Sequence, residues 1–179
     1  MRKLRTHELN RLDPVRYKQA EKVPLVVVLD HVRSSNNVGS IFRTCDALLV
    51  HSIRLCGITA TPPNKDIHKT ALNAEKWVDW HYVADTVEAV AALKADGFTV
   101  LAVEQTDHSI LLPDFNPAGD EKLALIFGNE VKGVQQKVID ECDGAIEIPQ
   151  YGTKHSFNVA VSAGIVLWDI VGKIKKRPG

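Results

Sequence analysis

Short, continuously apolar stretches recur along the chain and are rich in β-branched residues. They cover Pro24–Asp30, His51–Gly57, Phe98–Val103, Leu123–Phe127 and Ala145–Ile148. A strand covered on both faces is apolar at every position, whereas a strand with one wet face alternates apolar and polar residues. The stretches therefore predict a mostly parallel β-sheet that is buried on both sides.

Segments with helical spacing of apolar residues lie between these stretches. They are Val38–Leu49, Thr86–Asp96 and Val134–Glu141, and a fourth runs from about Asn158 to Lys175. Asp85 is a good N-cap for the second helix, and Gly97 stands where its C-cap belongs. The alternation of strand and helix predicts an α/β fold with helices flanking the sheet. Two Pro-containing stretches, residues 61–66 and 111–121, indicate surface loops.

The length of 179 residues is that of one ordinary domain. We expect residues 1–22 to form a basic, helical extension and residues 23–179 to form a single domain. No apolar run approaches the roughly 20 residues of a membrane span, so no membrane association is predicted. The N-terminus also lacks the apolar stretch of a secretory signal, which makes the cytoplasm the expected compartment.

The three cysteines, Cys45, Cys56 and Cys142, are far apart in the sequence. No C-x-x-C or H-E-x-x-H spacing is present, so the sequence predicts neither a metal site nor a redox site. Small core residues are the simplest interpretation of these side chains.

The formal net charge of zero argues weakly against a nucleic-acid partner, because such proteins usually carry a basic surface. The charge is unevenly distributed, however. Residues 1–22 hold seven Lys and Arg against three acids, and residues 173–177 add four basic residues and no acid. The basic ends are either solvated tails or one positive patch that the fold or a dimer brings together, and charge alone does not decide between these alternatives.

Three polar segments follow predicted strands, at the places where α/β proteins assemble their sites. The first is HVRSSNNVGSIFRTCD. Its Asn36 and Asn37 can cap a helix, and Arg43 then lies on the second helical turn. Taken alone, such residues are more often structural than functional.

The second segment, ALIFGNEVKGV, runs from a buried strand into two glycines that permit a tight turn and expose backbone N–H groups. It matches neither G-x-G-x-x-G nor the P-loop pattern, so it gives no support for a dinucleotide or triphosphate site. The third segment is IEIPQYGTKHSFNVAVSAG, where Ser156 and Asn158 open a helix rich in small residues. By themselves these two residues are helix caps.

Together, in this order, the segments resemble the three motifs of the SpoU/TrmH family of RNA ribose methyltransferases, over residues 24 to 172. Asn37, Gly39 and Arg43 match N-x-G followed by an arginine. The motif G-N-E-x-x-G is matched by Gly128, Asn129, Glu130 and Gly133, and the last motif by Ile148, Pro149, Ser156, Asn158 and Val159. Phe157 stands where the family usually has leucine, which we expect to alter packing rather than activity.

The resemblance implies an α/β fold with a C-terminal trefoil knot, although knots are rare in proteins generally. It implies S-adenosylmethionine as the cofactor, bound largely by the backbone of three loops. Carried over position by position, the cofactor-binding residues are Val103, Glu104, Gly128, Asn129, Gly133, Ile148, Pro149 and Phe157. No metal takes part.

The resemblance also implies catalytic roles for Arg43, Asn37, Ser156 and Asn158, and RNA-binding roles for Arg33, Arg43, Glu130 and Lys154. A guanidinium that stays charged in water is a poor base, so we expect Arg43 to orient the 2′-hydroxyl and its phosphate and to stabilise developing negative charge. Family members work as homodimers, commonly with RNA bound across both subunits.

Two further stretches, ALNAEKWVDW and LAVEQTDHSILL, are similar to the branch that methylates a guanosine ribose in the tRNA D-loop. The resemblance thus favours tRNA over rRNA as the partner. The alternatives are an rRNA 2′-O-methyltransferase, a knotted methyltransferase that modifies a base nitrogen, and a non-catalytic RNA-binding module. The 2′-hydroxyl distinguishes RNA from DNA, so ribose chemistry itself selects RNA.

Overall fold

A computed structural model describes residues 1–118 and 121–175 of the chain. Within these residues one seven-stranded sheet has the order β3-β2-β1-β6-β4-β7-β5, and every registered strand pair in it is parallel. The strands are β1 (Val23–Asp30), β2 (Val50–Cys56), β3 (Trp80–Val83), β4 (Thr99–Val103), β5 (Ile110–Leu111), β6 (Leu123–Phe127) and β7 (Gly144–Glu147). The predicted mostly parallel sheet is confirmed.

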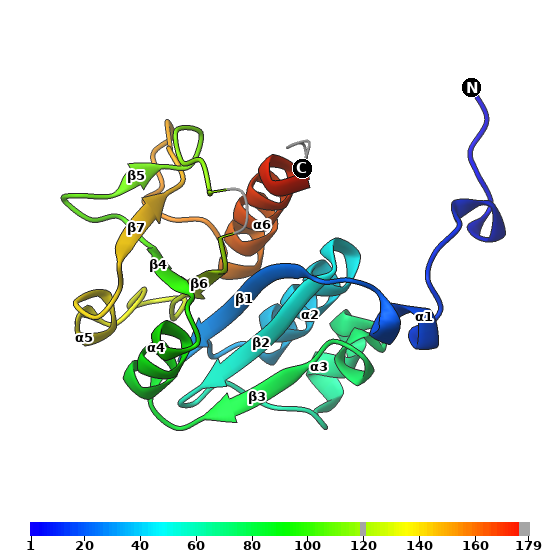
Figure 1. Cartoon of the computed structure of the whole chain (residues 1–179), viewed down its shortest axis with the longest axis horizontal. Helices are drawn as coiled ribbons and strands as arrows, with labels where there is room; N and C mark the ends of the chain where they lie inside the picture. Colours follow the sequence, from blue (N-terminus) through cyan, green and yellow to red (C-terminus); the bar gives the residue numbers. More distant parts are fainter. Residues whose placement is uncertain (119–120, 176–179) are drawn as a thin grey trace.

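Helices cover both faces of the sheet (Figure 1). On one face α2 (Ser35–Leu48), α3 (Lys65–Ala71) and α6 (Val159–Lys175) share a core with β1 and β6, and α2 packs directly against α3 and α6. On the other face α4 (Thr86–Ala95) and α5 (Gln136–Ile139) form a second core. The chain therefore has the three-layer α/β architecture that its sequence pattern predicts.

Strand β1 shows why the apolar stretches are continuous. Leu25, Val27 and Leu29 belong to one core, while Val26 and Val28 belong to the other, and all five side chains have an exposure of 0%. Burial of one such side chain contributes about 1.5–3 kcal/mol relative to leaving it in water. A polar substitution at any of these positions would remove that contribution from one of the two layers.

Strands β3 and β5 and helix α3 were not predicted from the pattern. Strand β3 lies at one edge of the sheet and β5 at the other, and most of their residues are exposed or half-buried, so neither carries a continuous apolar run. Helix α3 begins within the expected loop at residues 61–66, because the side chain of Asn64 accepts hydrogen bonds from the backbone N–H groups of Asp66 and Ile67. Helix α5 is shorter than the predicted helix in that region.

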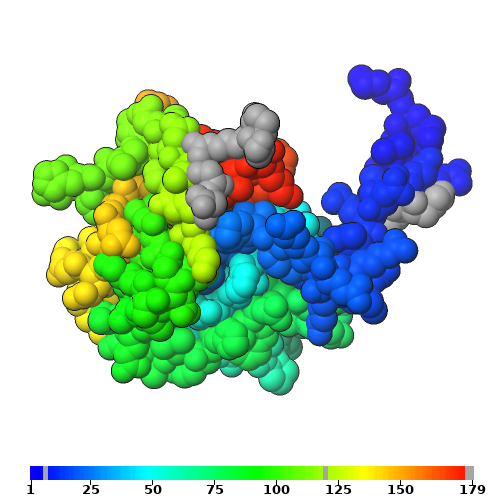
Figure 2. Space-filling model, in the orientation of Figure 1, coloured from blue at the N-terminus to red at the C-terminus, as the bar shows by residue number. Residues whose placement is uncertain are grey.

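The N-terminal region contains two short helical pieces, η1 (Thr6–Leu9) and α1 (Pro14–Gln19), and projects from the body of the molecule (Figures 1 and 2). Tyr17 on α1 is 4% exposed and anchors this arm to the main core. The ammonium group of Lys22 lies 3.4 Å from the centroid of the Tyr17 ring.

The basic C-terminal end is only partly described, since Lys176 and Arg177 lie outside the described residues. The Lys173 ammonium donates hydrogen bonds to the carbonyl oxygens of Leu112 and Phe115 at 2.7 and 2.8 Å and pairs with Asp169. Lys173 therefore binds the loop after β5. This contact takes one charge away from any basic patch at this end.

Within the described ranges, no helix is long and apolar enough to cross a membrane, and no group of three or more side chains is arranged to hold a metal ion. A short 3-10 helix, η2 (Ala74–Lys76), lies between α3 and β3 in the chain.

Candidate functional site

A cavity of about 730 Å³ opens at the carboxyl ends of β6, β4 and β7, which are neighbours in the sheet. Parallel α/β sheets bind their ligands at this edge, and the volume suits a small organic molecule. Its walls come from the ends of these strands, from the loops that follow them, and from the start of α6. The lining residues are Val103–Gln105, Phe127–Val134, Gln136, Ile139, Ile146–Ile148, Gln150, His155–Val159 and Ser162.

The loop after β6 forms one wall. Asn129 and Gly133 exchange two backbone hydrogen bonds of 3.0 and 2.9 Å, which close the loop. Gly133 has a φ of +67°, and a Cβ at Gly128 would lie 2.1 Å from the carbonyl carbon of Gly133. Both positions thus require glycine, one for its backbone conformation and the other for the close approach of two backbone segments.

The Asn129 side chain holds this loop from within. Its Nδ2 donates to the carbonyl oxygen of His31 at 2.8 Å, and its Oδ1 accepts from the N–H groups of Val131 and Lys132. The loop after β6 is thereby tied to the end of β1, its neighbour in the sheet.

Glu130 connects the second motif to the first. Its carboxylate accepts hydrogen bonds from the N–H groups of Arg33 and Ser34 and from Nδ2 of Asn37, at 2.9, 2.9 and 3.0 Å. Partial burial opposes the ionisation of Glu130, but these donors outweigh it and lower the pKa of the carboxyl below its ordinary value of 4.5. Glu130 is therefore held as a carboxylate that fixes the start of α2.

Asn158 connects the third motif to the first. Its Nδ2 donates to Oδ1 of Asn37 at 3.2 Å, while its Oδ1 accepts from the N–H groups of Ala160 and Val161 at the start of α6. The capping role and the functional position thus belong to the same side chain. Glu130, Asn37 and Asn158 form a chain of polar contacts that joins segments about a hundred residues apart.

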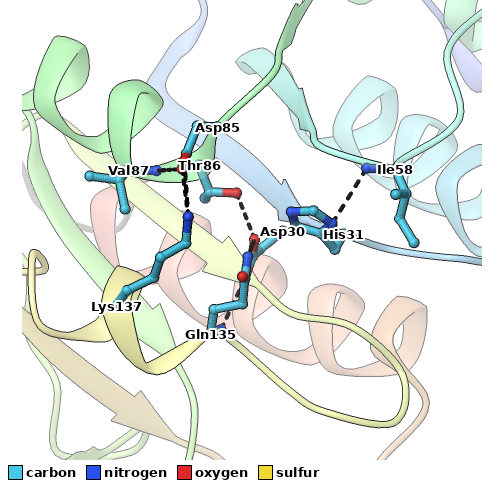
Figure 3. A network of polar contacts seen from close by, with 8 residues as sticks. All are labelled: Asp30, His31, Ile58, Asp85, Thr86, Val87, Gln135 and Lys137. Carbon is cyan, nitrogen blue, oxygen red and sulfur yellow. Dashed lines mark hydrogen bonds and ion pairs between the residues drawn. The ribbon is translucent and has the colours of Figure 1, made fainter.

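We call the loop after β6, residues 128–134, the glycine loop. A buried polar cluster around Asp30 lies next to it (Figure 3). Asp30 is fully buried and accepts hydrogen bonds from Oγ of Thr86 and from both the backbone N–H and the side-chain amide of Gln135, at 2.6, 2.9 and 2.8 Å. The nearby Lys137 ammonium pairs with Asp85, and that contact lowers the pKa of the Asp85 carboxyl. The signal for Asp30 in the sequence is a charged residue that ends a fully apolar strand.

Most of the residues that the sequence predicts to bind the cofactor lie in the wall of the cavity. Its wall includes Val103, Glu104, Gly128, Asn129, Gly133, Ile148 and Phe157, as well as Ser156, Asn158 and Glu130. Pro149 does not line it, although both of its neighbours do. Asn37 adjoins it through its contacts with Glu130 and Asn158. Arg33 and Lys154 are exposed, Arg33 beside Glu130 and Lys154 in the loop between β7 and α6.

Arg43 lies elsewhere. It is exposed on α2 and lines a second hollow of about 680 Å³, together with Arg11, Lys69 and Trp168. This hollow, which we call the α2–α6 groove, also includes Ser40, Thr44, Ala47, Leu48, Thr70 and Gly164. The predicted catalytic arginine is therefore separate from the cavity wall and lies among other cations.

Several cavity residues were not predicted. Gln105 follows the predicted residues Val103 and Glu104, and Glu147 precedes the predicted residue Ile148. Ser162 lies four residues, or about one helical turn, after Asn158. Their spacing from predicted residues was the available signal. His155 carries no such signal, because it lies in an irregular loop that only the fold brings to the cavity.

These features define a parallel α/β protein whose ligand cavity is built from three loops at the carboxyl ends of adjacent strands. Residues 24–168 match the SpoU rRNA Methylase family, and the chain belongs to that family. It is 34% identical over 146 residues to the tRNA (guanosine(18)-2′-O)-methyltransferase of Thermus thermophilus, a match that covers 81% of this chain and 73% of the relative. It is 31% identical over 148 residues to the 23S rRNA (guanosine-2′-O-)-methyltransferase RlmB of Neisseria meningitidis, covering 80% of this chain but only 56% of the relative.

Solved structures agree with this assignment. The TrmH/SpoU tRNA modifying enzyme of A. aeolicus has a TM-score of 0.80 at 26% identity, covering 91% of this chain and 83% of that one. The AdoMet-bound rRNA methyltransferase of Sinorhizobium meliloti has a TM-score of 0.76 at 26% identity, covering 86% of this chain and 58% of that one.

Proposed function

We propose that this chain transfers a methyl group from S-adenosylmethionine to a ribose 2′-hydroxyl of RNA, with tRNA as the preferred substrate and a D-loop guanosine as the expected position. The observation that carries the proposal is the chain of contacts through Glu130, Asn37 and Asn158, which unites the three motif segments beside one cavity. The names of the Thermus and Neisseria relatives support ribose methylation as the reaction, on tRNA and rRNA respectively.

The cavity fits the proposed donor. Gly128 and Gly133 lie in its wall, where an added Cβ would strike the Gly133 backbone or the Glu104 carboxylate, and the acidic residue Glu147 suits a cationic ligand. Val103, Ile148 and Phe157 supply apolar surface for an adenosyl group. S-adenosylmethionine supplies a methyl group on a positively charged sulfur, from which a ribose oxygen displaces it.

The chain's own groups orient the acceptor and handle charge. Asn37, Ser156 and Asn158 hold the ribose at the mouth of the cavity, where the Asn37 and Asn158 amides are already fixed by their mutual contact. Arg43 binds the adjacent phosphate and stabilises negative charge that develops on the ribose oxygen as its proton leaves. Arg33, Lys154 and Glu130 contact the RNA around this point.

We further propose that the chain acts as a homodimer through the outer face of α6. Val161 and Trp168 on this face are 49% and 73% exposed, although the opposite face of the helix is buried in the core. Large exposed apolar side chains that share one face are typical of interaction surfaces. Because Trp168 and Arg43 line the same groove, a partner on this face would set Arg43 beside the interface, with RNA bound across both subunits.

The dimer is tested by sedimentation of the wild-type chain and of Trp168→Glu at the concentration used for activity measurements. We expect a wild-type dimer, a monomeric variant and a matching loss of methyl transfer. A wild-type monomer that is fully active would refute this part of the proposal.

We also propose the trefoil knot of the family. After β7, near the outer side of the sheet, the chain must return to α6, which packs against α2 beside β1. Pulling on both ends of a single molecule tests the knot, since a tightened knot shortens the extended length below that of the full 179-residue chain. Extension to full length would refute it. We propose the cytoplasm as the compartment.

The activity is tested with methyl-labelled S-adenosylmethionine and unmodified total tRNA or rRNA. After alkaline hydrolysis, label in alkali-stable dinucleotides is expected, because a 2′-O-methyl group prevents cleavage of the following phosphodiester. Label confined to mononucleotides would indicate base methylation. Donor binding without label in any RNA would support a binding module instead.

A further inference from the structure

The Glu104 side chain reaches from the end of β4 to the glycine loop after β6. Its Oε2 accepts a hydrogen bond from the backbone N–H of Val134 at 3.0 Å, and its Oε1 accepts one from the N–H of Gln105 at 2.9 Å. The backbone N–H of Glu104 donates to the carbonyl oxygen of Ile146 at 3.1 Å, which fixes the residue between β4 and β7. One carboxylate thus joins two walls of the cavity.

Gly133 is shaped to receive this carboxylate. A Cβ at Gly133 would lie 2.2 Å from Oε2 of Glu104, and the other two atoms nearest to it also belong to the Glu104 carboxyl group. On its other side Gly133 contacts Gly128, whose own Cβ would meet the Gly133 backbone. Glu104 therefore packs against Gly133, and Gly133 packs against Gly128.

The next peptide is held from the opposite side. Asp30 binds the N–H of Gln135, so two carboxylates from different strands bind the N–H groups of consecutive residues, Val134 and Gln135. The neighbouring Gln105 adds a link to the third loop, because its Nε2 donates to the carbonyl oxygen of His155 at 3.0 Å. All three cavity loops are thus connected at the end of β4.

We propose that Glu104 is a positioning residue of the donor pocket. Its carboxylate fixes the glycine loop in the conformation that receives the donor, and it takes no part in the transfer itself. The inference rests on the proposed function, because it takes S-adenosylmethionine as the ligand of the cavity. It assigns to the side chain a role distinct from the backbone contact that the family resemblance implies.

The first test measures donor affinity by calorimetry and steady-state kinetics with RNA for the wild type, Glu104→Ala and Glu104→Gln. A hydrogen bond to a charged group is worth about ten- to a hundred-fold in binding. We expect Glu104→Ala to weaken donor binding and raise the donor KM by at least about tenfold, with kcat at saturating donor and the KM for RNA unchanged. Glu104→Gln keeps one acceptor oxygen and should recover part of the affinity.

The control is Glu88→Ala, which removes an exposed carboxylate from α4, a helix that contributes no residue to the cavity wall, and should change none of these values. Thermal unfolding of each variant verifies folding. Unchanged donor affinity in Glu104→Ala, or a loss confined to kcat, would overturn the proposal.

The second test uses Gly133→Ala alone and combined with Glu104→Ala. Because the added Cβ clashes only with the Glu104 carboxylate, its effect on donor affinity should be several-fold smaller when Glu104 is already alanine. The backbone strain at Gly133 is present in both backgrounds and cancels. Strictly additive losses would overturn the proposal.

These measurements separate the inference from the proposed function. A wild-type chain that binds the donor and shows the Glu104 effects but methylates no RNA would refute the function and leave the role of Glu104 intact. A wild-type chain that binds no donor would refute both.

Discussion

The donor cavity and the α2–α6 groove are similar in volume but differ in how their residues are held. In the cavity, Glu104, Glu130 and Asn158 each make at least two hydrogen bonds, of which at least one joins a distant segment. In the groove, Arg43 forms no hydrogen bond or ion pair to any residue in the described part of the chain, and Trp168 is largely exposed. The cavity is thus pre-organised, whereas the groove exposes positive charge and an aromatic side chain that a binding partner could contact.

This difference assigns separate tasks to the two regions. A pre-organised cavity binds a small ligand without paying again to order its loops. An exposed cationic groove with an aromatic side chain suits a phosphate backbone or a second subunit, which supplies the missing partners. Variants in the cavity should therefore affect donor binding, and variants in the groove should affect the reaction with RNA.

The largest effect is expected for Arg43→Ala. Loss of a charged group that stabilises the transition state should reduce kcat by about 10²–10³-fold or more, while calorimetry should show unchanged donor binding. Arg43→Lys separates charge from geometry, because lysine keeps the charge but cannot form two parallel hydrogen bonds. Near-normal turnover of Arg43→Ala would remove this residue from the mechanism.

The next effect is expected for Gly128→Ala, which forces a Cβ to within 2.1 Å of the Gly133 backbone. Overpacking of this kind costs about 1–3 kcal/mol, and we expect donor affinity to fall about ten- to a hundred-fold as the loop shifts. The matched control is Gly144→Ala at the start of β7, the end of that strand away from the cavity, where an added Cβ makes only an ordinary 3.4 Å contact with Leu101 and should leave donor affinity unchanged. Equal donor affinity in the two variants would contradict a role for the close approach of Gly128 to the Gly133 backbone.

A smaller effect is expected for Asn158→Asp. Aspartate keeps the oxygen that caps α6 but loses the Nδ2 donor to Asn37, so Tm should change little while kcat falls about tenfold, as for one lost hydrogen bond of about 1.4 kcal/mol. Asn158→Ala removes both contacts and should lower Tm as well. If the two variants lose the same stability and the same activity, the polar chain between the motifs has no separate role.

The smallest effect concerns pH and Glu130. Because the pKa of Glu130 is lower in the folded protein than its ordinary value of 4.5, its hydrogen bonds stabilise the fold above pH 4.5 and are lost as pH falls through the folded pKa. Glu130→Gln should therefore be less stable than the wild type at pH 7, with a difference that narrows below pH 4.5. Urea unfolding between pH 3 and 7 measures this, and a difference independent of pH would contradict the assignment.

The sheet was predictable where strands are buried on both faces and not where they are edges. Strand β1 gives a continuous apolar run because its two faces enter two cores. Strands β3 and β5 are short and partly exposed, so their local sequences carry no such pattern. Physical burial, which creates the pattern, is what the edge strands lack.

The site was predictable to the extent that it lies in contiguous segments. The three motifs mark the loops around the cavity, but the contact between Asn37 and Asn158 joins residues 121 positions apart and has no local signature. The hydrogen bonds of the Asp30 and Glu104 carboxylates likewise have no local signature, since each carboxylate binds the backbone of a distant segment. The position of Arg43 outside the cavity follows from the direction of α2, which a motif does not encode.

The most direct measurement of the central claim is mass spectrometry of nucleosides from an unmodified tRNA transcript incubated with S-adenosylmethionine and the purified chain. We expect one 2′-O-methylated nucleoside per transcript, formed by the wild type and absent with Arg43→Ala. A methylated base, or no methylated nucleoside in any tRNA or rRNA despite donor binding, would contradict it.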